Sequence, residues 1–173
     1  HDFAKPQAAR LKGWRRAWRH TDLRPVAFLT AVPDPDCEID GLIAQVPRGD
    51  WVALDQREWA YDRVAVTPSV THGLREAAEI AVYAVPPARQ NTPDEMYPVL
   101  LSYIDVVVQG YLREFGQDGV RAFFATTSGW DTPVLDDRAA PRYPRHQALS
   151  AAERVFVDAA LADCGARIVQ PDA

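Results

Sequence analysis

This sequence of 173 residues is poor in the features that mark several large classes of protein. It contains two cysteines, Cys37 and Cys164, which are too few for a disulfide framework and fit a reducing cytoplasm. No apolar run approaches the ~20 residues of a membrane span, and no secretory signal is visible. A net charge of −5 argues against a nucleic-acid partner. We therefore expect a cytoplasmic protein that binds neither membranes nor nucleic acid.

The motifs of metal-dependent, nucleophilic and phosphate-binding enzymes are also missing. No pair of histidines has the spacing of metal ligands, because the four are scattered at His1, His20, His72 and His146. The sequence has no G-x-S-x-G nucleophile motif and no glycine loop that would cradle a phosphate. We expect neither a metal ion nor another cofactor.

The composition is nevertheless that of a folded protein. Hydrophobic residues make up 47% of the chain, which is typical of a globular protein and not of a disordered one. The length suits one domain with a sizeable core, so residues 1–173 are predicted to form a single domain. Nothing in the sequence sets the oligomeric state.

The first half of the chain predicts mainly strands. Strand-like patterns cover residues 9–20, 26–32, 37–46, 62–66 and 79–85. The stretch Pro33-Asp34-Pro35-Asp36 has turn chemistry, so the second and third of these strands should form a hairpin. Asp50 is a good N-cap for a short helix over residues 51–60.

The second half predicts helices. Apolar residues at helical spacing cover residues 94–115, with Gly116 as the C-cap, and a shorter helix follows over 119–127. Residues 130–147 contain three prolines and are expected to be irregular. Ser150-x-x-Glu153 is a capping box that opens a helix to Cys164, which Gly165 ends. Strands early and helices late predict an α+β fold.

Two charged stretches in the first half have more than one interpretation. The basic run Arg10–Arg19 is interleaved with Trp14 and Trp18, as in a nucleic-acid stripe, but its alternation favours a half-exposed strand with a solvated cationic face. Acidic residues alternate over residues 34–40, as in a calcium loop. They lack the glycine and distal glutamate of an EF-hand, so a solvated hairpin turn is favoured.

Polar stretches in the second half could also serve function. Residues 126–130, Thr-Thr-Ser-Gly-Trp, favour a helix end over a nucleophile site. The stretch Asp136-Asp137-Arg138 and the pattern Arg142-x-x-Arg145-His146 could bind an anionic group. A surface ion-pair network is the favoured interpretation, because such residues are mostly exposed.

Glu58 is the candidate for proton transfer. Trp51, Leu54 and Glu58 recur at i, i+3 and i+7, so they share one helix face, which the two apolar residues mark as buried. Desolvation raises the pKa of a carboxyl group, and a glutamate tuned in this way shuttles protons near neutral pH. We expect Glu58 to lie partly buried in a concave pocket. The alternative is a glutamate at the edge of the core that is bonded to a nearby arginine.

Several short motifs follow one another in a characteristic order. Between residues 9 and 70 they are Ala-Arg-Leu-Lys-Gly-Trp-Arg-Arg at 9–16, Ile-Asp-Gly-Leu-Ile-Ala-Gln-Val at 39–46, Leu54-Asp55-x-x-Glu58 and Tyr61-x-Arg63. Together they resemble the γ-glutamylcyclotransferase-like family. The stretches Ser102-Tyr103-Ile104-Asp105 and Tyr143-Pro144-Arg145-His146 resemble a bacterial branch of that family, so the likeness covers most of the chain.

The resemblance implies a fold, a reaction and a site. The fold is a small mixed β-barrel with helices packed outside. The reaction closes a γ-glutamyl amide, such as glutathione, to 5-oxoproline and releases the amine. The glutamate at the position of Glu58 is the family's catalytic acid and base. Tyr61 and Arg63 could line the pocket or orient Glu58; their alternatives are barrel packing for Tyr61 and a structural ion pair for Arg63.

One motif of the family is absent from this sequence. The family's first strand ends in a tyrosine-glycine-serine loop that holds the γ-glutamyl group, and the sequence begins at about the point after that loop. We expect the strand and loop to be missing from the N-terminus, which would leave an unfilled sheet edge near Glu58 and an inactive fragment. The alternatives are a non-catalytic binding or interaction protein on the same fold, or a lyase that acts on a γ-glutamyl group of a larger natural product.

Overall fold

The computed structural model describes residues 5–23, 25–74 and 79–171 and has the mixed α+β composition that the sequence predicts. The chain divides into two compact units, His1–Arg16 with Thr30–Arg89 and Ala17–Leu29 with Gln90–Ala173. Within the described ranges no helix is both long and apolar enough to cross a membrane. The expectation of a single domain stays a prediction.

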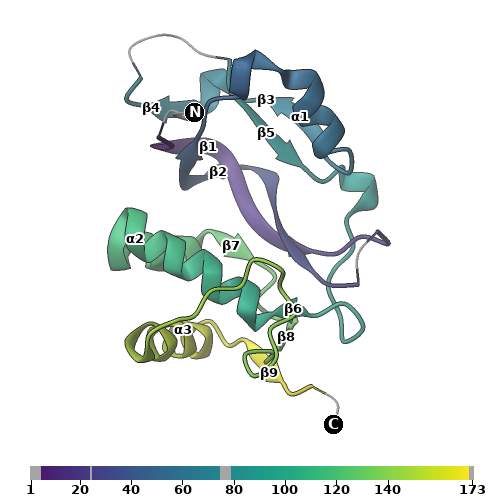
Figure 1. Ribbon diagram of the computed structural model, residues 1–173, viewed down its shortest axis with the longest axis vertical. Coiled ribbons are helices and arrows are strands. Elements are labelled where there is room, and N and C mark those ends of the chain that lie inside the picture. The colour runs from purple at the N-terminus through teal and green to yellow at the C-terminus, as the bar shows by residue number, and fades with distance from the viewer. Residues whose placement is uncertain (1–4, 24, 75–78, 172–173) are drawn as a thin grey trace. The chain divides into compact units, whose positions relative to one another are not determined.

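The first unit consists of strands, short 3-10 helices (labelled η) and one short α-helix, α1 (Figure 1). In chain order its elements are β1 (Gln7–Arg19), β2 (Phe28–Ile43), η1 (Pro47–Gly49), α1 (Trp51–Arg57), β3 (Asp62–Ala65), η2 (Thr67–Ser69), β4 (Val70–His72), β5 (Ala81–Ala84) and η3 (Pro87–Arg89). One sheet has the order β2-β1-β4, and β1 pairs with β4 in antiparallel register. The other is the antiparallel pair β3–β5, in which Arg63 lies opposite Tyr83. The ends of β1 and β2 extend into the second unit.

The hairpin expected around residues 33–36 is wrong, because Phe28–Ile43 is one continuous strand. Proline cannot donate to a strand ladder and is therefore found on edge strands. β2 is such an edge in the order β2-β1-β4. Pro33 and Pro35 are two residues apart, so their missing N–H groups face the same side, which is compatible with an open edge. The turn chemistry was thus overridden by strand pairing.

The acidic alternation of β2 is paired with arginines of β1 instead of solvated. Arg10 Nε lies 3.0 Å from Asp40 Oδ1, and Arg15 Nε lies 2.7 Å from Asp34 Oδ2. Strict alternation would place these two arginines on opposite faces, but Gly13 between them has φ +82°, which is typical of a β-bulge. The hydrogen bond from Arg15 lowers the pKa of the Asp34 carboxyl. Cross-strand ion pairs therefore join the two charged stretches through Arg10 and Arg15.

The helix α1 begins as predicted and ends early. The Asp50 carboxylate accepts a hydrogen bond from the Ala53 N–H at 3.0 Å, which confirms the N-cap. The helix ends at Arg57 instead of Ala60, and Glu58 is its C-cap. The helix buries no residue completely, but the predicted inner face is half-buried at positions 51, 54 and 58, and so is position 55 beside it.

The second unit combines helices with short parallel strands that the sequence did not reveal. Its elements are β6 (Val99–Leu100), α2 (Leu101–Ala125), β7 (Thr127–Ser128), β8 (Pro133–Leu135), α3 (Ala151–Asp163) and β9 (Arg167–Val169). β6 and β9 both pair with β8 in parallel, so the stretch expected to be irregular contains the central strand of this sheet. β7 pairs with β1, whose last residues belong to this unit.

The predicted helix over residues 94–115 begins at Leu101 instead. The Asp94 carboxylate accepts hydrogen bonds from the N–H groups of Met96 and Tyr97, which forms a turn in place of a helix. Pro98 follows, and a proline disfavours the helical conformation of the residue before it. The turn and the proline together postpone the helix to Leu101.

Gly116 interrupts α2 with φ 65° and ψ −167°, a conformation that essentially only glycine adopts. The expectation of one helix ending at Gly116 and a shorter one beyond it is therefore close to the observed arrangement. The second segment ends at Ala125, where the Thr126 and Thr127 hydroxyls donate to the carbonyls of Ala122 and Phe123, both at 2.6 Å. This is the helix end that the Thr-Thr-Ser-Gly-Trp stretch predicted.

Asp137 caps the N-terminus of α2 from a distant part of the chain. Its carboxylate accepts hydrogen bonds from the Ser102 N–H at 2.8 Å, the Ser102 hydroxyl at 2.6 Å and the Arg142 N–H at 2.8 Å. The N-cap residue of α2 itself, Leu100, has an apolar side chain that cannot accept a hydrogen bond from the helix N-terminus. Asp137 is 2% exposed, so this part of the expected surface ion-pair network is buried.

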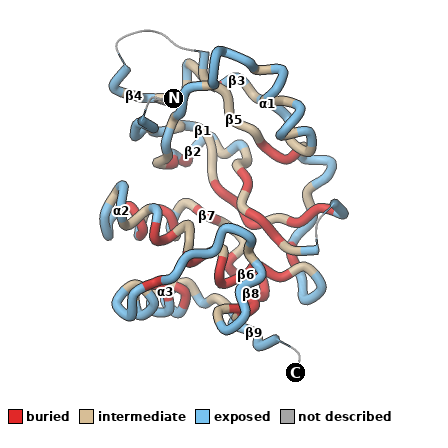
Figure 2. The backbone as a smooth tube through the Cα atoms, viewed as in Figure 1, coloured by how far each residue is buried: buried red, intermediate tan, exposed pale blue. Residues whose placement is uncertain are grey.

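The main hydrophobic core lies within the second unit (Figure 2). α2 and α3 pack against each other there. The fully buried side chains of this core include Trp18, Ile104, Val108, Phe123 and Val157. The capping box that begins α3 is confirmed, because the Ser150 hydroxyl accepts from Glu153 N–H and the Glu153 carboxylate accepts from Ser150 N–H.

The strand pairings do not form a closed barrel in the part of the chain that the structure describes. The strands make three separate sheets, and each has open edges. The pair β3–β5, which is the one nearest to Glu58 along the chain, has two strands and hence an open edge on either side. The closed barrel and the missing strand that would complete it stay predictions.

Candidate functional site

Glu58 lies at the C-terminal end of α1. Its N–H donates to the Leu54 carbonyl at 2.9 Å, and its own carbonyl accepts from the Tyr61 N–H at 2.8 Å, so the chain turns here toward β3. The carboxylate is 27% exposed and is bonded to Arg57, whose Nε lies 2.9 Å from Oε1. Glu58 is therefore partly buried but accessible from solvent.

A second carboxylate, Asp55, lies one helical turn before Glu58 and holds α1 to the β3–β5 pair. The Tyr83 hydroxyl donates to Asp55 Oδ1 at 2.5 Å, and Arg63 Nε lies 3.2 Å from the same oxygen. Partial burial raises the pKa of Tyr83 to about 12, with further contributions from the Asp55 hydrogen bond and from the negative charge of Glu58. Tyr83 thus remains a hydrogen-bond donor at neutral pH.

Trp51 completes this cluster at the other end of α1. The guanidinium of Arg63 lies 4.7 Å from the centroid of the Trp51 ring, which is a cation–π distance. The same arginine therefore contacts Asp55 and Trp51 on the helix from its place on β3. We name Trp51, Asp55, Glu58, Arg63 and Tyr83 the α1 cluster.

The three predicted site residues are Glu58, Tyr61 and Arg63. They are close in the sequence but have different partners in the structure. Arg63 contacts Asp55 and not Glu58 among the ion pairs described. Tyr61 is half-buried and follows Glu58 in the turn. The sequence reasoning missed Tyr83, because its proximity depends on the register of β5 opposite β3. Asp55 carried a usable signal, since it is three residues before Glu58 on the half-buried face.

The α1 cluster offers proton-transfer groups and aromatic surface. Two carboxylates lie one turn apart, one of them fixed by a tyrosine and an arginine. No group of three or more His, Cys, Asp or Glu side chains is arranged to hold a metal ion within residues 5–23, 25–74 and 79–171. The carboxylates of the α1 cluster are groups that can take part in acid–base chemistry.

The two motifs of the second unit meet at the start of α2. The rings of Tyr103 and Tyr143 stack with centroids 4.3 Å apart and 5° between their planes. The Tyr143 N–H donates to the Ser102 hydroxyl at 3.3 Å. His146 Nδ1 lies 3.0 Å from the Tyr143 carbonyl oxygen. Packing between α2 and the segment after β8 thus joins both motifs within one unit.

Comparison with known proteins gives matches of fold only. No protein-family model matches the sequence, and no curated protein matches it. The chain is similar to the solved structure of the uncharacterized protein loc79017 from Homo sapiens, with a TM-score of 0.50 and 14% identity over 88% of this chain and 83% of that chain. A structure named gamma-glutamyl cyclotransferase gives a TM-score of 0.49 and 13% identity over the same shares. At 14% identity, the similarity to the human protein concerns the fold alone.

Proposed function

We propose that the chain is a γ-glutamylcyclotransferase in which Glu58 moves the proton. The observation that carries this proposal is the state of Glu58 within the motif Leu54-Asp55-x-x-Glu58. Its carboxylate is partly buried at the end of a helix, and its partner in the described contacts is an exposed neighbour, Arg57. Exposed ion pairs of this kind contribute only about 0–1 kcal/mol, so a substrate can displace Arg57 at little cost.

Asp55 is the other carboxylate of the motif and is less suited to the task. It accepts a hydrogen bond from Tyr83 and pairs with Arg63, so both contacts engage its carboxylate within the protein. A carboxylate held in this way is less available to a substrate, and it fixes the helix that carries Glu58. We assign Asp55 and Tyr83 the role of supporting α1 and Glu58 the role of proton shuttle.

The proposed reaction needs no nucleophile from the protein. The α-amine of a γ-glutamyl amide attacks its own γ-carbonyl carbon, a C–N bond forms and the ring of 5-oxoproline closes. Two protons leave the α-ammonium nitrogen as it becomes the lactam N–H. Glu58 takes them in turn and delivers the first to the departing amine as the original amide C–N bond breaks and the second to the released amine, which leaves as an ammonium ion. One carboxylate can perform both transfers.

Positioning supplies much of the rate in this chemistry. Oriented intramolecular attack can be worth about 7–11 kcal/mol, provided that the amine is held near the carbonyl. Backbone N–H groups would stabilise the tetrahedral oxyanion. The family resemblance assigns that role largely to the tyrosine-glycine-serine loop, which this sequence does not contain.

Tyr61 and Arg63 are proposed to line or support the substrate site. Arg63 contacts Asp55 and the Trp51 ring, which favours a supporting role for it within the α1 cluster. Tyr61 directly follows the turn at Glu58. We further propose that residues 1–173 belong to one domain, and that the protein acts in the cytoplasm on a small γ-glutamyl compound, without a cofactor.

A panel of γ-glutamyl amines tests the proposal. The protein expressed from its complete reading frame is incubated with glutathione, with γ-glutamyl amino acids and with a γ-glutamyl alkylamine, and 5-oxoproline is quantified together with the released amine. Formation of both in equal amounts from at least one compound is the expected result. Binding of these compounds without turnover would contradict the enzyme and favour the non-catalytic alternative on the same fold.

A further inference from the structure

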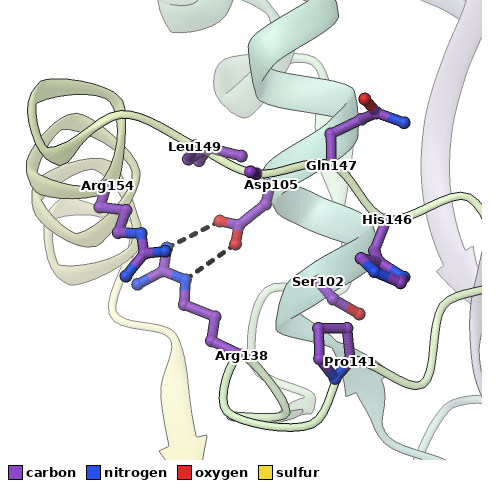
Figure 3. A pocket seen from close by; sticks show the side chains of 9 residues that line it. Ser102, Asp105, Arg138, Pro141, His146, Gln147, Leu149 and Arg154 are labelled. Carbon is purple, nitrogen blue, oxygen red and sulfur yellow. Dashed lines mark hydrogen bonds and ion pairs between the residues drawn. The ribbon is translucent and has the colours of Figure 1, made fainter.

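The second unit contains a cavity of about 310 Å³ at the beginning of α2 and α3 (Figure 3). Ligand sites of proteins begin at about this volume. Its lining comes from α2, from the segment after β8 and from the first turn of α3. The lining residues are Ser102, Asp105, Arg138, Pro141, His146, Gln147, Ala148, Leu149 and Arg154.

One side of the cavity is held rigidly by Arg138. Its Nε and Nη2 atoms donate to both oxygens of Asp105, at 2.8 and 2.7 Å, and its Nη1 atom donates to Asp158 at 2.6 Å. The pKa of the Arg138 guanidinium is raised, chiefly by the hydrogen bond to Asp105. Both oxygens of Asp105 are therefore engaged by a permanent cation, which weakens the repulsion of a second anion by this carboxylate, although Asp158 shares the same cation.

Arg154 supplies positive charge that is not neutralised in this way. It lies in the first turn of α3, where the helix dipole disfavours a cation. In the contacts described for this chain, Arg154 forms no ion pair with a carboxylate, and its side chain borders the cavity (Figure 3). A guanidinium offers two parallel N–H donors that match the oxygens of a carboxylate or a phosphate.

Part of the remaining wall of the cavity is apolar. Leu149, which is 8% exposed and belongs to the core cluster, Pro141 and Ala148 contribute this part, and Ser102, His146 and Gln147 contribute polar groups. A ligand that combines an oxyanion with a short carbon chain would match a cationic side and an apolar side at once. An inorganic ion would use only the first of these.

We propose that this cavity binds a small organic anion, with its carboxylate or phosphate group on Arg154 and its carbon atoms against Leu149 and Pro141. The sequence offers Arg138 and the pattern Arg142-x-x-Arg145-His146 for an anion; the proposed site uses Arg154 instead, because two carboxylate partners already occupy Arg138. The site is independent of the cyclotransferase proposal, because it uses none of the residues of the α1 cluster.

Titrations followed by amide NMR on the 173-residue chain test the proposal. The probes are succinate, glycerol 3-phosphate and, as an uncharged match, glycerol. We expect saturable shifts at the amides of residues 146–149 and 154 with at least one anion and none with glycerol. The tighter of the two anions identifies the preferred head group.

Two arginine variants separate a built site from general attraction to positive charge. Arg154→Gln should weaken binding by about tenfold or more, as expected for the loss of a charge-assisted pair. Arg121→Gln is the matched control, since Arg121 is an exposed arginine of α2 outside the lining, and it should leave the affinity unchanged. Unchanged spectra of the free variants verify their fold. Equal losses in both variants, or shifts that do not saturate with either anion, would overturn the proposal.

Discussion

Asp137 should contribute more to stability than an exposed carboxylate does, because it is buried and holds the start of α2. Replacing it by alanine leaves three donors without their acceptor, namely the Ser102 N–H, the Ser102 hydroxyl and the Arg142 N–H. A buried donor that stays unsatisfied costs about 1–3 kcal/mol, so the two buried donors of Ser102 sum to roughly 2–6 kcal/mol, and the Arg142 N–H is only partly buried. Because water can reach part of the vacated space, we expect a loss of about 3–5 kcal/mol from the free energy of unfolding.

Urea denaturation followed by tryptophan fluorescence measures this loss, since Trp18 and Trp130 belong to the core beside α2. Asp137→Asn keeps one acceptor oxygen and should cost about 2 kcal/mol. Asp158→Ala is the control: its carboxylate is 57% exposed and pairs with Arg138, so its removal should cost about 0–1 kcal/mol. If Asp137→Ala costs no more than Asp158→Ala, the capping role assigned to Asp137 is refuted.

Two further predictions concern the break in α2 and the α1 cluster. Gly116→Ala should destabilise the chain by about 1–2 kcal/mol, because φ 65° with ψ −167° strains any other residue. Gly110→Ala, in the regular part of α2, should stabilise it by about 0.5–1 kcal/mol. Changes in melting temperature of the same sign for both variants would contradict this. Tyr83 should ionise with a midpoint near pH 12 in ultraviolet titrations of the wild type against Tyr83→Phe, and Asp55→Asn should lower that midpoint. Folding raises the pKa of Tyr83 from 10.0, so the contribution of Tyr83 to stability should be complete below pH 10 and disappear as the pH rises to about 12. A titration midpoint of Tyr83 at pH 10 would argue against its burial and its hydrogen bond to Asp55.

Features that depend on neighbouring residues were predictable from the sequence. The N-cap at Asp50 and the capping box of Ser150 and Glu153 need only side chains within three residues of one another, and both are present. The break at Gly116 likewise follows from one residue with special backbone freedom.

Features that depend on strand pairing or on distant residues were not predictable in this way. The strands β6, β8 and β9 have two or three residues each, which is too short for a periodic pattern. Pro33 and Pro35 predict a turn until it is known that β2 is an edge strand. The cap on Ser102 comes from Asp137, 35 residues away in the chain. Helix propensity and turn chemistry contain no information about such partners.

The candidate site follows the same division. Glu58 and its half-buried face were accessible from the helical spacing of residues 51–58. The hydrogen bond between Tyr83 and Asp55 spans 28 residues and requires the register of β3 and β5. The sequence therefore indicated the candidate for proton transfer but not the contacts of Asp55, Arg63 and Tyr83 that hold its helix.

The rate of 5-oxoproline formation by Glu58→Gln tests the central claim most directly. The variant is made in the protein expressed from its complete reading frame, with Glu95→Gln as the control, since Glu95 pairs with Arg167 in the second unit. Glutamine keeps the size and hydrogen-bonding capacity of glutamate but cannot accept the proton. We predict that Glu58→Gln lowers the rate by a factor of about 10² or more while Glu95→Gln retains the wild-type rate. A folded Glu58→Gln protein that keeps most of the activity would contradict the account.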